Sequence, residues 1–277
     1  MDKSPVYSAL IDADTILYRI GFLKTVGTDV SLRILLLEKA IASIAFKLKD
    51  MAHLQFGYDI ELFFHAFIQK DDPTPRMRSQ FDYETKYKEN RLTSNKPMHM
   101  QEMKNRFLDR DFIFEDSRGK EDIIYSHPVL PGIEEVDDAI SIECYSLEAD
   151  KLAFPIAAHV DKDLNQIAGW HYNYNKNLLY VQSQKNADKF FFIQLLMGDI
   201  TDNIPGIRGV GQITAKKLLE SADTVDEMWE IVLRTYLKAY KETHSEDEIT
   251  ELLYERGNKL WIRRKPGEIW TPPIPSP

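Results

Sequence analysis

Short apolar runs alternate along this chain with longer segments whose apolar positions recur at helical spacing. The apolar runs predict strands over residues 6–11, 60–68, 154–160 and 178–181. The helical spacing predicts helices over residues 32–52, 135–147 and 189–197, the first with Ser31 as its N-cap. Strands that alternate with helices favour a mostly parallel sheet with right-handed crossovers. Residues 69–131 are polar and give no clear element.

The pattern changes after Asp202, where a glycine-rich stretch is followed by helical spacing alone. Helices are predicted over residues 214–219, 223–240 and 247–256. With the helix that precedes Asp202, the first of these forms two helices joined by a glycine-rich hairpin. Five prolines between residues 266 and 277 predict an irregular tail.

Acidic residues gather where the predicted strands and helices meet their loops. The clusters contain Asp12 and Asp14, Asp71 and Asp72, Glu134, Glu135, Asp137 and Asp138, Asp161 and Asp163, and Asp199 and Asp202. Parallel strands bring their carboxyl ends to one edge of a sheet, where ligands bind. Converging carboxylates repel each other unless a cation neutralises them, and oxygen-only groups suit Mg²⁺ or Mn²⁺. The pattern therefore predicts a metal-dependent phosphoryl-transfer site.

Each cluster also has a simpler interpretation. Glu135 and Asp138 are acids of a kind that the helix dipole favours in a first turn, and Asp202 suits a helix N-cap. Residues 161–165 begin like a calcium loop, but Gln166 and Tyr172 stand where that loop needs glycine and a carboxylate. A solvated turn remains the alternative there.

A basic segment interrupts this acidic chain. Between Lys86 and Arg110 lie seven basic and three acidic residues, although the whole chain has a net charge of −9. Tyr87 could stack on a base of single-stranded nucleic acid, with phosphate contacts from Lys88 and Arg91. The alternative is a solvated charged helix.

The glycine-rich hairpin after Asp202 is a second candidate contact with nucleic acid. Its glycines would let backbone N–H groups approach a phosphate, and its carbonyls could hold a monovalent cation such as K⁺. The predicted DNA-binding residues here and in the basic segment are Lys86, Lys88, Arg91, Gly206, Arg208, Gly209, Gly211, Thr214 and Lys216.

Bulk composition narrows the setting. The 277 residues suffice for a large α/β domain with a smaller lobe. A single cysteine, Cys144, excludes an internal disulfide and fits a reducing cytoplasm. No apolar run reaches the roughly 18 residues of a membrane span, and no secretion signal is seen.

Five ordered motifs resemble the flap endonuclease and 5′→3′ exonuclease superfamily, especially its bacterial and bacteriophage branch. They are Ile11-Asp12-Ala13-Asp14, Tyr87-Lys88-Glu89-Asn90-Arg91, Glu135-Val136-Asp137-Asp138, Asp161-Lys162-Asp163-Leu164-Asn165-Gln166, and Gly198-Asp199 through Asp202-Asn203-Ile204-Pro205-Gly206 to Gly211. One motif departs, because the second strand lacks the family's Phe-Asp. Asp71 or Asp72 is the nearest acid that could take that role.

The resemblance implies a PIN-like, mostly parallel sheet flanked by helices, with a helix-hairpin-helix DNA-binding lobe. The core would span residues 1–198, with a basic arch over about 84–130, followed by the lobe at 199–265 and the tail at 266–277. Tyr87, Lys88 and Arg91 would be catalytic. The implied metal ligands are Asp12, Asp71, Asp72, Glu135, Asp137, Asp138, Asp161, Asp163, Asp199 and Asp202.

The implied activity is cleavage of DNA that has a 5′ end, nick or flap, with the help of two Mg²⁺ or Mn²⁺ ions. The resemblance also implies a cytoplasmic monomer that serves phage replication or DNA degradation. Two alternatives stay open: removal of RNA primers from RNA–DNA hybrids, and DNA binding without catalysis.

Overall fold

A seven-stranded sheet forms the centre of the larger lobe in the computed structural model, which describes residues 4–57, 60–70, 74–91, 95–97, 99–116, 119–130 and 132–273. The strand order is β3-β4-β2-β1-β5-β6-β7. The five inner strands pair in parallel, and each edge strand pairs antiparallel with its neighbour. The bounds are β1 Val6–Asp12, β2 Glu61–Gln69, β3 Phe112–Glu115, β4 Glu121–Val129, β5 Phe154–His159, β6 Gly169–Asn173 and β7 Leu178–Gln182.

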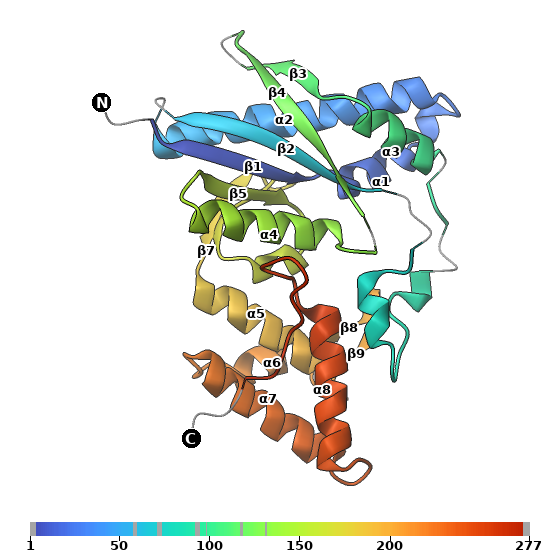
Figure 1. The fold of residues 1–277 in the computed structure, drawn as a ribbon, viewed down its shortest axis with the longest axis vertical. Helices are drawn as coiled ribbons and strands as arrows, with labels where there is room; N and C mark the ends of the chain where they lie inside the picture. Colours follow the sequence, from blue (N-terminus) through green and yellow to red (C-terminus); the bar gives the residue numbers. More distant parts are fainter. Residues whose placement is uncertain are drawn as a thin grey trace.

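Helices cover both faces of this sheet (Figure 1). Alternate residues of β1 and β2 enter a core with the helices α1 (Asp14–Gly21), α2 (Val30–Phe56) and α3 (Met100–Leu108). The residues between them on the same strands enter a second core with α4 (Val136–Ala149). Because the central strands are buried on both faces, they appear in the sequence as continuous apolar runs.

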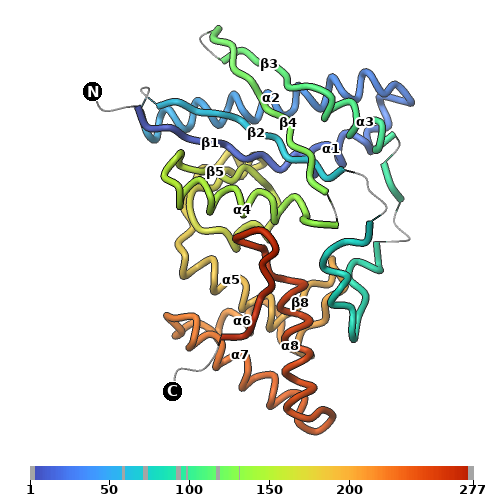
Figure 2. The backbone as a smooth tube through the Cα atoms, in the orientation of Figure 1, coloured from blue at the N-terminus to red at the C-terminus, as the bar shows by residue number. Residues whose placement is uncertain are grey.

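A helical lobe lies below the sheet in the view of Figure 2. It contains α5 (Gln184–Met197), α6 (Gln212–Leu218), α7 (Val225–Tyr240) and α8 (Glu246–Leu260). A two-stranded ribbon, β8 (Gly198–Asp199) with β9 (Ile204–Pro205), follows α5 directly. The mixed α/β fold with a mostly parallel sheet is confirmed.

The structure corrects the predicted arch. The core of the sheet contains buried side chains from this region: Met103 and Phe107 of α3, Phe112 and Phe114 of β3, and Ile124 of β4. Residues 99–130, as far as they are described, therefore belong to the body rather than to an arch over 84–130. The segment that leaves the body is residues 74–91, which runs down beside the helical lobe before the chain returns to α3 (Figure 1).

The boundary of the lobe and the predicted tail also change. Phe191 of α5 packs in the core of the helical lobe, so the lobe begins before residue 199. Trp270 is buried against Phe191 and Trp229 and exchanges hydrogen bonds with Asn258, so the supposed tail is anchored at least to there. Residues 274–277 lie outside the described part of the chain.

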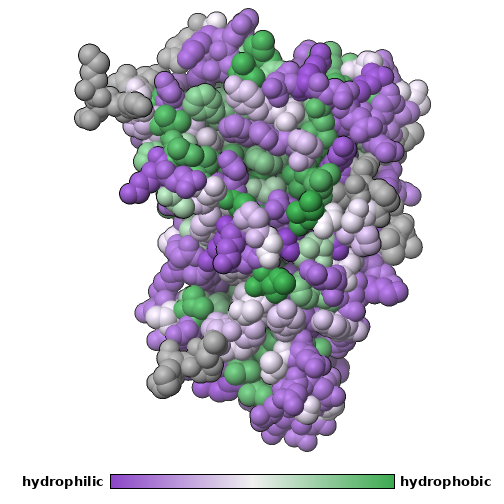
Figure 3. Space-filling view, viewed as in Figure 1, coloured by the Kyte–Doolittle hydropathy of each residue, from purple (hydrophilic) through white to green (hydrophobic). Residues whose placement is uncertain are grey.

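The face drawn in Figure 3 is mostly hydrophilic, with hydrophobic side chains scattered across it. Isolated exposed apolar residues of this kind are normal on a water-facing surface. Among the described residues, no helix is both long and apolar enough to pass through a membrane.

Candidate active site

The carboxyl end of β1 places Asp12 at the edge of the sheet. Asp12 is 6 % exposed and accepts hydrogen bonds from the amide of Thr15 at 3.3 Å and its hydroxyl at 2.7 Å. Burial raises the pKa of Asp12 to about 7; the bonds from Thr15 oppose this, and the charges of Asp14 and Asp161 add to it. Asp161 follows β5, the parallel neighbour of β1. The predicted convergence of acids at this edge therefore holds for these residues.

The start of α4 carries the next carboxylates. Glu135 is the N-cap, and Asp138 completes a capping box by accepting from the Glu135 amide. Asp138 is fully buried, and its oxygens also accept from both terminal nitrogens of Arg78, at 2.9 and 2.7 Å, and from the Arg263 amide at 3.0 Å. These four bonds use about all the lone pairs a carboxylate offers. As it stands, Asp138 has no position left for a metal ion.

Glu135 receives three donors on one oxygen. The Tyr87 hydroxyl lies 2.8 Å from Oε2, the Lys88 ammonium 2.9 Å and the Arg78 guanidinium 3.0 Å, while Arg76 binds the other oxygen. Burial alone would raise the pKa of Glu135, but Lys88, Arg78 and Arg76 hold it well below the ordinary value. Glu135 is therefore a fully compensated carboxylate.

The structure corrects the proposed stacking role of Tyr87. Its side chain is 6 % exposed, and its hydroxyl points at Glu135 and, at 3.2 Å, at Asp202. Burial, together with the charge of Glu135, raises its pKa well above the ordinary value. No face of Tyr87 is open to a base in this arrangement.

Two lysines bridge carboxylates of different motifs. Lys88 lies 2.9 Å from Glu135 and 3.6 Å from Asp202, which Arg91 also binds. Lys162 lies 3.0 Å from Asp163 and also binds Asp199. Acids from three of the predicted clusters are thus held partly by the chain's own ammonium groups.

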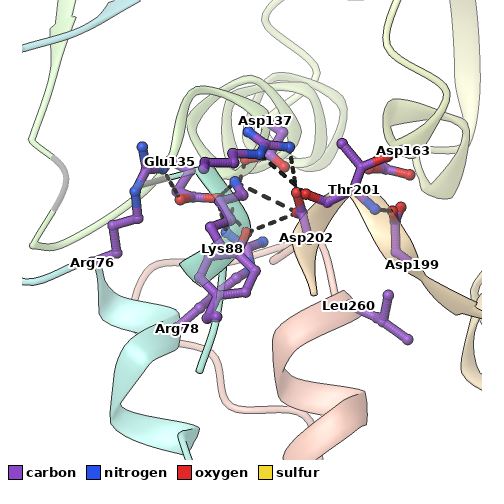
Figure 4. Close-up of polar contacts among 12 residues, drawn as sticks. Arg76, Arg78, Lys88, Glu135, Asp137, Asp163, Asp199, Thr201, Asp202 and Leu260 are labelled. Carbon is purple, nitrogen blue, oxygen red and sulfur yellow. Dashed lines mark hydrogen bonds and ion pairs between the residues drawn. The ribbon is translucent and has the colours of Figure 1, made fainter. Parts of the chain in front are cut away.

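A small pocket brings four of the predicted ligands together, as Figure 4 shows for the same side chains. Its lining includes Asp137, Asp163, Asp199 and Asp202, with Arg78, Tyr87, Gln194, Lys259, Leu260 and Ile262 on the remaining wall. Burial raises the pKa of Asp137 well above the ordinary value; Arg78 opposes this, and Asp138 and Glu135 add to it. The pKa of Asp163 is raised by burial and by Asp161. Burial therefore disfavours the ionised forms of two of the pocket carboxylates, Asp137 and Asp163, whereas Lys162 lowers the pKa of Asp199.

As the side chains stand, no three His, Cys, Asp or Glu residues within the described residues converge closely enough to hold a metal ion. Asp71 and Asp72 lie outside the described residues. The described end of β2 is Gln69, whose amide group donates to the carbonyls of Val129 and Glu134. The second strand therefore ends in an amide where the resemblance calls for an acid.

The predicted hairpin divides into buried and exposed positions. A Cβ on Gly206 would lie 2.1 Å from the Met197 carbonyl carbon, so this glycine is required by backbone packing within the lobe. The exposed residues of the hairpin and of the helix after it include Arg208, Gly209, Gly211, Thr214 and Lys216. Ile213, which the sequence did not single out, is 86 % exposed beside them.

No role in the site was predicted from the sequence for four cations that organise it, namely Arg76, Arg78, Lys162 and Lys259. No family motif marks these residues apart from Lys162. Their importance follows from ion pairs with residues far away in the sequence.

Comparison with known proteins points in one direction. No family model matches the chain. It is 30 % identical over 146 residues to DNA polymerase I of Bacillus subtilis (strain 168), covering 41 % of this chain and 16 % of the polymerase. It is 33 % identical over 109 residues to a 5′-3′ exonuclease of Buchnera aphidicola, covering 36 % of this chain and 37 % of that protein. Over the matched segments the chain is similar to members of the flap endonuclease and 5′→3′ exonuclease superfamily.

Solved structures from this superfamily share the fold. The zinc-bound 5′-exonuclease of bacteriophage T5 aligns with a TM-score of 0.55 and 13 % identity, covering 90 % of this chain and 88 % of that one. A flap endonuclease of the same phage, solved with DNA and metal ions, aligns with a TM-score of 0.53 and 13 % identity, covering 91 % and 89 %. The chain nevertheless spans well under two thirds of the curated relatives it matches.

Proposed function

We propose that this chain is a metal-dependent 5′ nuclease that hydrolyses phosphodiester bonds of DNA at or near a 5′ end. The observation that carries the proposal is the pocket that gathers Asp137, Asp163, Asp199 and Asp202 from separate elements. Carboxylates beside cationic side chains suit phosphoryl transfer, where positioning and charge stabilisation supply most of the catalysis. The names of the matched relatives, 5′-3′ exonuclease and DNA polymerase I, support the same activity.

Divalent cations fit the donor chemistry of the site. The carboxylates are oxygen donors, as Mg²⁺ and Mn²⁺ prefer, and burial, with a smaller contribution from neighbouring acids, raises the pKa values of Asp12, Asp137 and Asp163, so a cation would favour their ionised forms. The phage nucleases solved with metal ions, zinc in one of them, support the use of divalent metal. We assign Asp12 and Asp137 to one ion and Asp161, Asp163, Asp199 and Asp202 to a second. We leave Glu135 and Asp138 out because each already accepts from four donors.

The chain's own cations would orient the substrate. Lys88 is 12 % exposed and already lies between two carboxylates, so it is placed to hold a scissile phosphate near the metal ligands. Arg91 is 45 % exposed and adds a second donor at the same edge. A bound divalent ion would supply activated water and stabilise the leaving oxygen.

The exposed part of the hairpin would grip duplex DNA without reading its sequence, through Arg208, Lys216 and backbone amides. The same proposal includes a K⁺ ion held by the hairpin carbonyls. It also includes a monomeric state, a cytoplasmic location and a role in phage replication or DNA degradation. The T5 and polymerase relatives support it by analogy.

The test is cleavage of three 5′-labelled substrates: a DNA duplex, a 5′ flap and an RNA-primed duplex, each with Mg²⁺, Mn²⁺ or EDTA. We expect short 5′ products from DNA that require metal. Asp137→Ala should abolish them, whereas the exposed Asp247→Ala, a matched loss of one carboxylate, should not. Preference for the RNA strand would favour primer removal. Binding without cleavage in either metal would favour the DNA-binding alternative, which the Gln69 end of β2 keeps open.

A further inference from the structure

Lys88 has a backbone conformation that its own residue type does not favour. Its φ is 55°, in the left-handed region, which a residue with a Cβ rarely adopts without strain. Such a conformation persists only where neighbouring structure fixes it. One such restraint is the hydrogen bond from the Lys88 amide to the Asp202 carbonyl, at 2.9 Å. Residues 200–203 make further contacts with the segment around Lys88, through Asn203, Ile200 and Thr201.

A second set of contacts comes from α8, which follows much later in the sequence. We call residues 82–91 the Lys88 loop and the charged residues Glu255, Arg256 and Lys259 the α8 clamp. Glu255 accepts the backbone amides of Glu84 at 3.0 Å and Thr85 at 3.2 Å.

The two basic members of the α8 clamp hold the same loop through its acceptors. Lys259 donates to the Thr85 carbonyl and lies 3.1 Å from Asp82, while Arg256 donates to the Glu84 carboxylate at 2.8 Å. The α8 clamp therefore satisfies both donors and acceptors of the Lys88 loop.

Asp82 connects the α8 clamp to Tyr87, the residue before Lys88. The Asp82 carboxylate that meets Lys259 also accepts the Tyr87 amide at 2.9 Å. A displacement of Asp82 would shift Tyr87, and with it the left-handed turn at Lys88. The chain of contacts from α8 to Lys88 is thus Lys259, Asp82 and Tyr87.

The burial of the clamp argues for a positioning role. The side chains of Lys259, Glu255 and Arg256 are 0 %, 2 % and 3 % exposed. Buried ion pairs seldom stabilise more than apolar residues of the same volume, whereas they can fix one specific arrangement. Apolar residues would serve if α8 had only to complete the core of its lobe. Three buried charges that face one loop instead define the register of that loop.

We propose that Glu255 and Lys259 are positioning residues for Lys88, and through it for the scissile phosphate. The last step rests on the proposed function; the restraint of the Lys88 loop does not. Lys259 also lines the carboxylate pocket, but its ammonium group is engaged with Thr85, Asp82 and Glu255. It therefore acts through the loop rather than on the substrate.

A double-mutant cycle tests this coupling. We expect Lys259→Met to lower kcat on the flap substrate roughly ten- to hundredfold, because small misplacements of a catalytic group have effects of that size. KM should change much less. In a Lys88→Ala background, Lys259→Met should have no further effect on kcat. Equal fold-losses in both backgrounds would overturn the proposal, since they would indicate general damage to the lobe.

Two further variants keep the test decisive. Glu255→Gln retains one acceptor and should give a smaller loss, so it replaces Lys259→Met if that variant fails to fold. Leu253→Ala, in the core of the same lobe and fully buried, is the matched control. It should lower stability without the dependence on Lys88.

Hydrogen exchange supplies a readout that needs no catalysis. Lys259→Met and Glu255→Gln should selectively speed exchange at the amides of Glu84, Thr85 and Tyr87, and Leu253→Ala should not. Unchanged exchange at these amides in both clamp variants would refute the restraint. If the wild-type protein cleaves no DNA, the proposed function fails, and the exchange result still decides the clamp.

Discussion

For Arg78→Met the structure predicts a large loss of stability. The guanidinium is 1 % exposed and donates four hydrogen bonds: two to Asp138, one to Glu135 and one to the Trp261 carbonyl. These bonds join the 74–91 segment to α4 and to the chain after α8. Removing the cation removes all four hydrogen bonds at once.

The magnitude follows from what the substitution leaves behind. Glu135 keeps Arg76 and Lys88 as partners. Asp138, which has no exposure to water, keeps only two backbone amides and loses its nearest cation. Breaking a buried pair from one side costs about 3–5 kcal/mol, because an uncompensated charge stays buried. We expect the free energy of unfolding to fall by that amount at neutral pH.

The assay is urea denaturation followed by circular dichroism, with two companion variants. Arg78→Met/Asp138→Asn removes the stranded charge and should recover at least half of the loss. Arg106→Met breaks an exposed pair with Glu102 and should cost less than about 1 kcal/mol. A loss below 1 kcal/mol for Arg78→Met, or a double variant no more stable than the single one, would refute this reasoning.

Three further predictions can be tested by standard measurements. Gly206→Ala should lower the melting temperature, with overpacking worth about 1–3 kcal/mol, because its Cβ meets the Met197 backbone; Gly211→Ala, with nothing within 4 Å, should not, and equal effects would contradict the packing argument. Because the pKa of Asp12 is raised to about 7, the folded state keeps its proton longer than the unfolded state. In EDTA this residue's contribution to stability should fall as pH rises from about 4 to about 7, so Asp12→Asn should remove part of that slope in urea titrations; identical slopes would disprove it. Lys216→Ala should weaken DNA binding and reduce the salt slope of log K by about 1, measured by fluorescence anisotropy; an unchanged slope would remove Lys216 from the interface.

The inner strands were predictable because they are buried on both faces. β1, β2 and β5 appear as apolar runs, and an acid follows β1 and β5 at the shared edge. That placement needs only the geometry of parallel strands, so Asp12 and Asp161 could be brought together from the sequence.

The outer strands and the ionic contacts could not be predicted in the same way. β4 has only Ile124 and Val129 buried along nine residues, so its polar positions conceal the strand. β6 was missed because its buried His171 is polar and is paired by tertiary contact with His159 at 2.8 Å. The partners of Arg78 and Lys259 depend on how distant segments approach each other, which local periodicity does not record.

The left-handed turn at Lys88 has a consequence for the order of events during synthesis. Thr85 and its partner Lys259 are 174 residues apart in the chain. A ribosome that adds about 5–20 residues per second makes Thr85 roughly 10–30 s before Lys259. During that interval the sheet can form, but the loop lacks the helix that sets its shape. We expect the Lys88 loop to take its final shape only after α8 leaves the exit tunnel, so that translation itself sets the time at which this part of the site is complete.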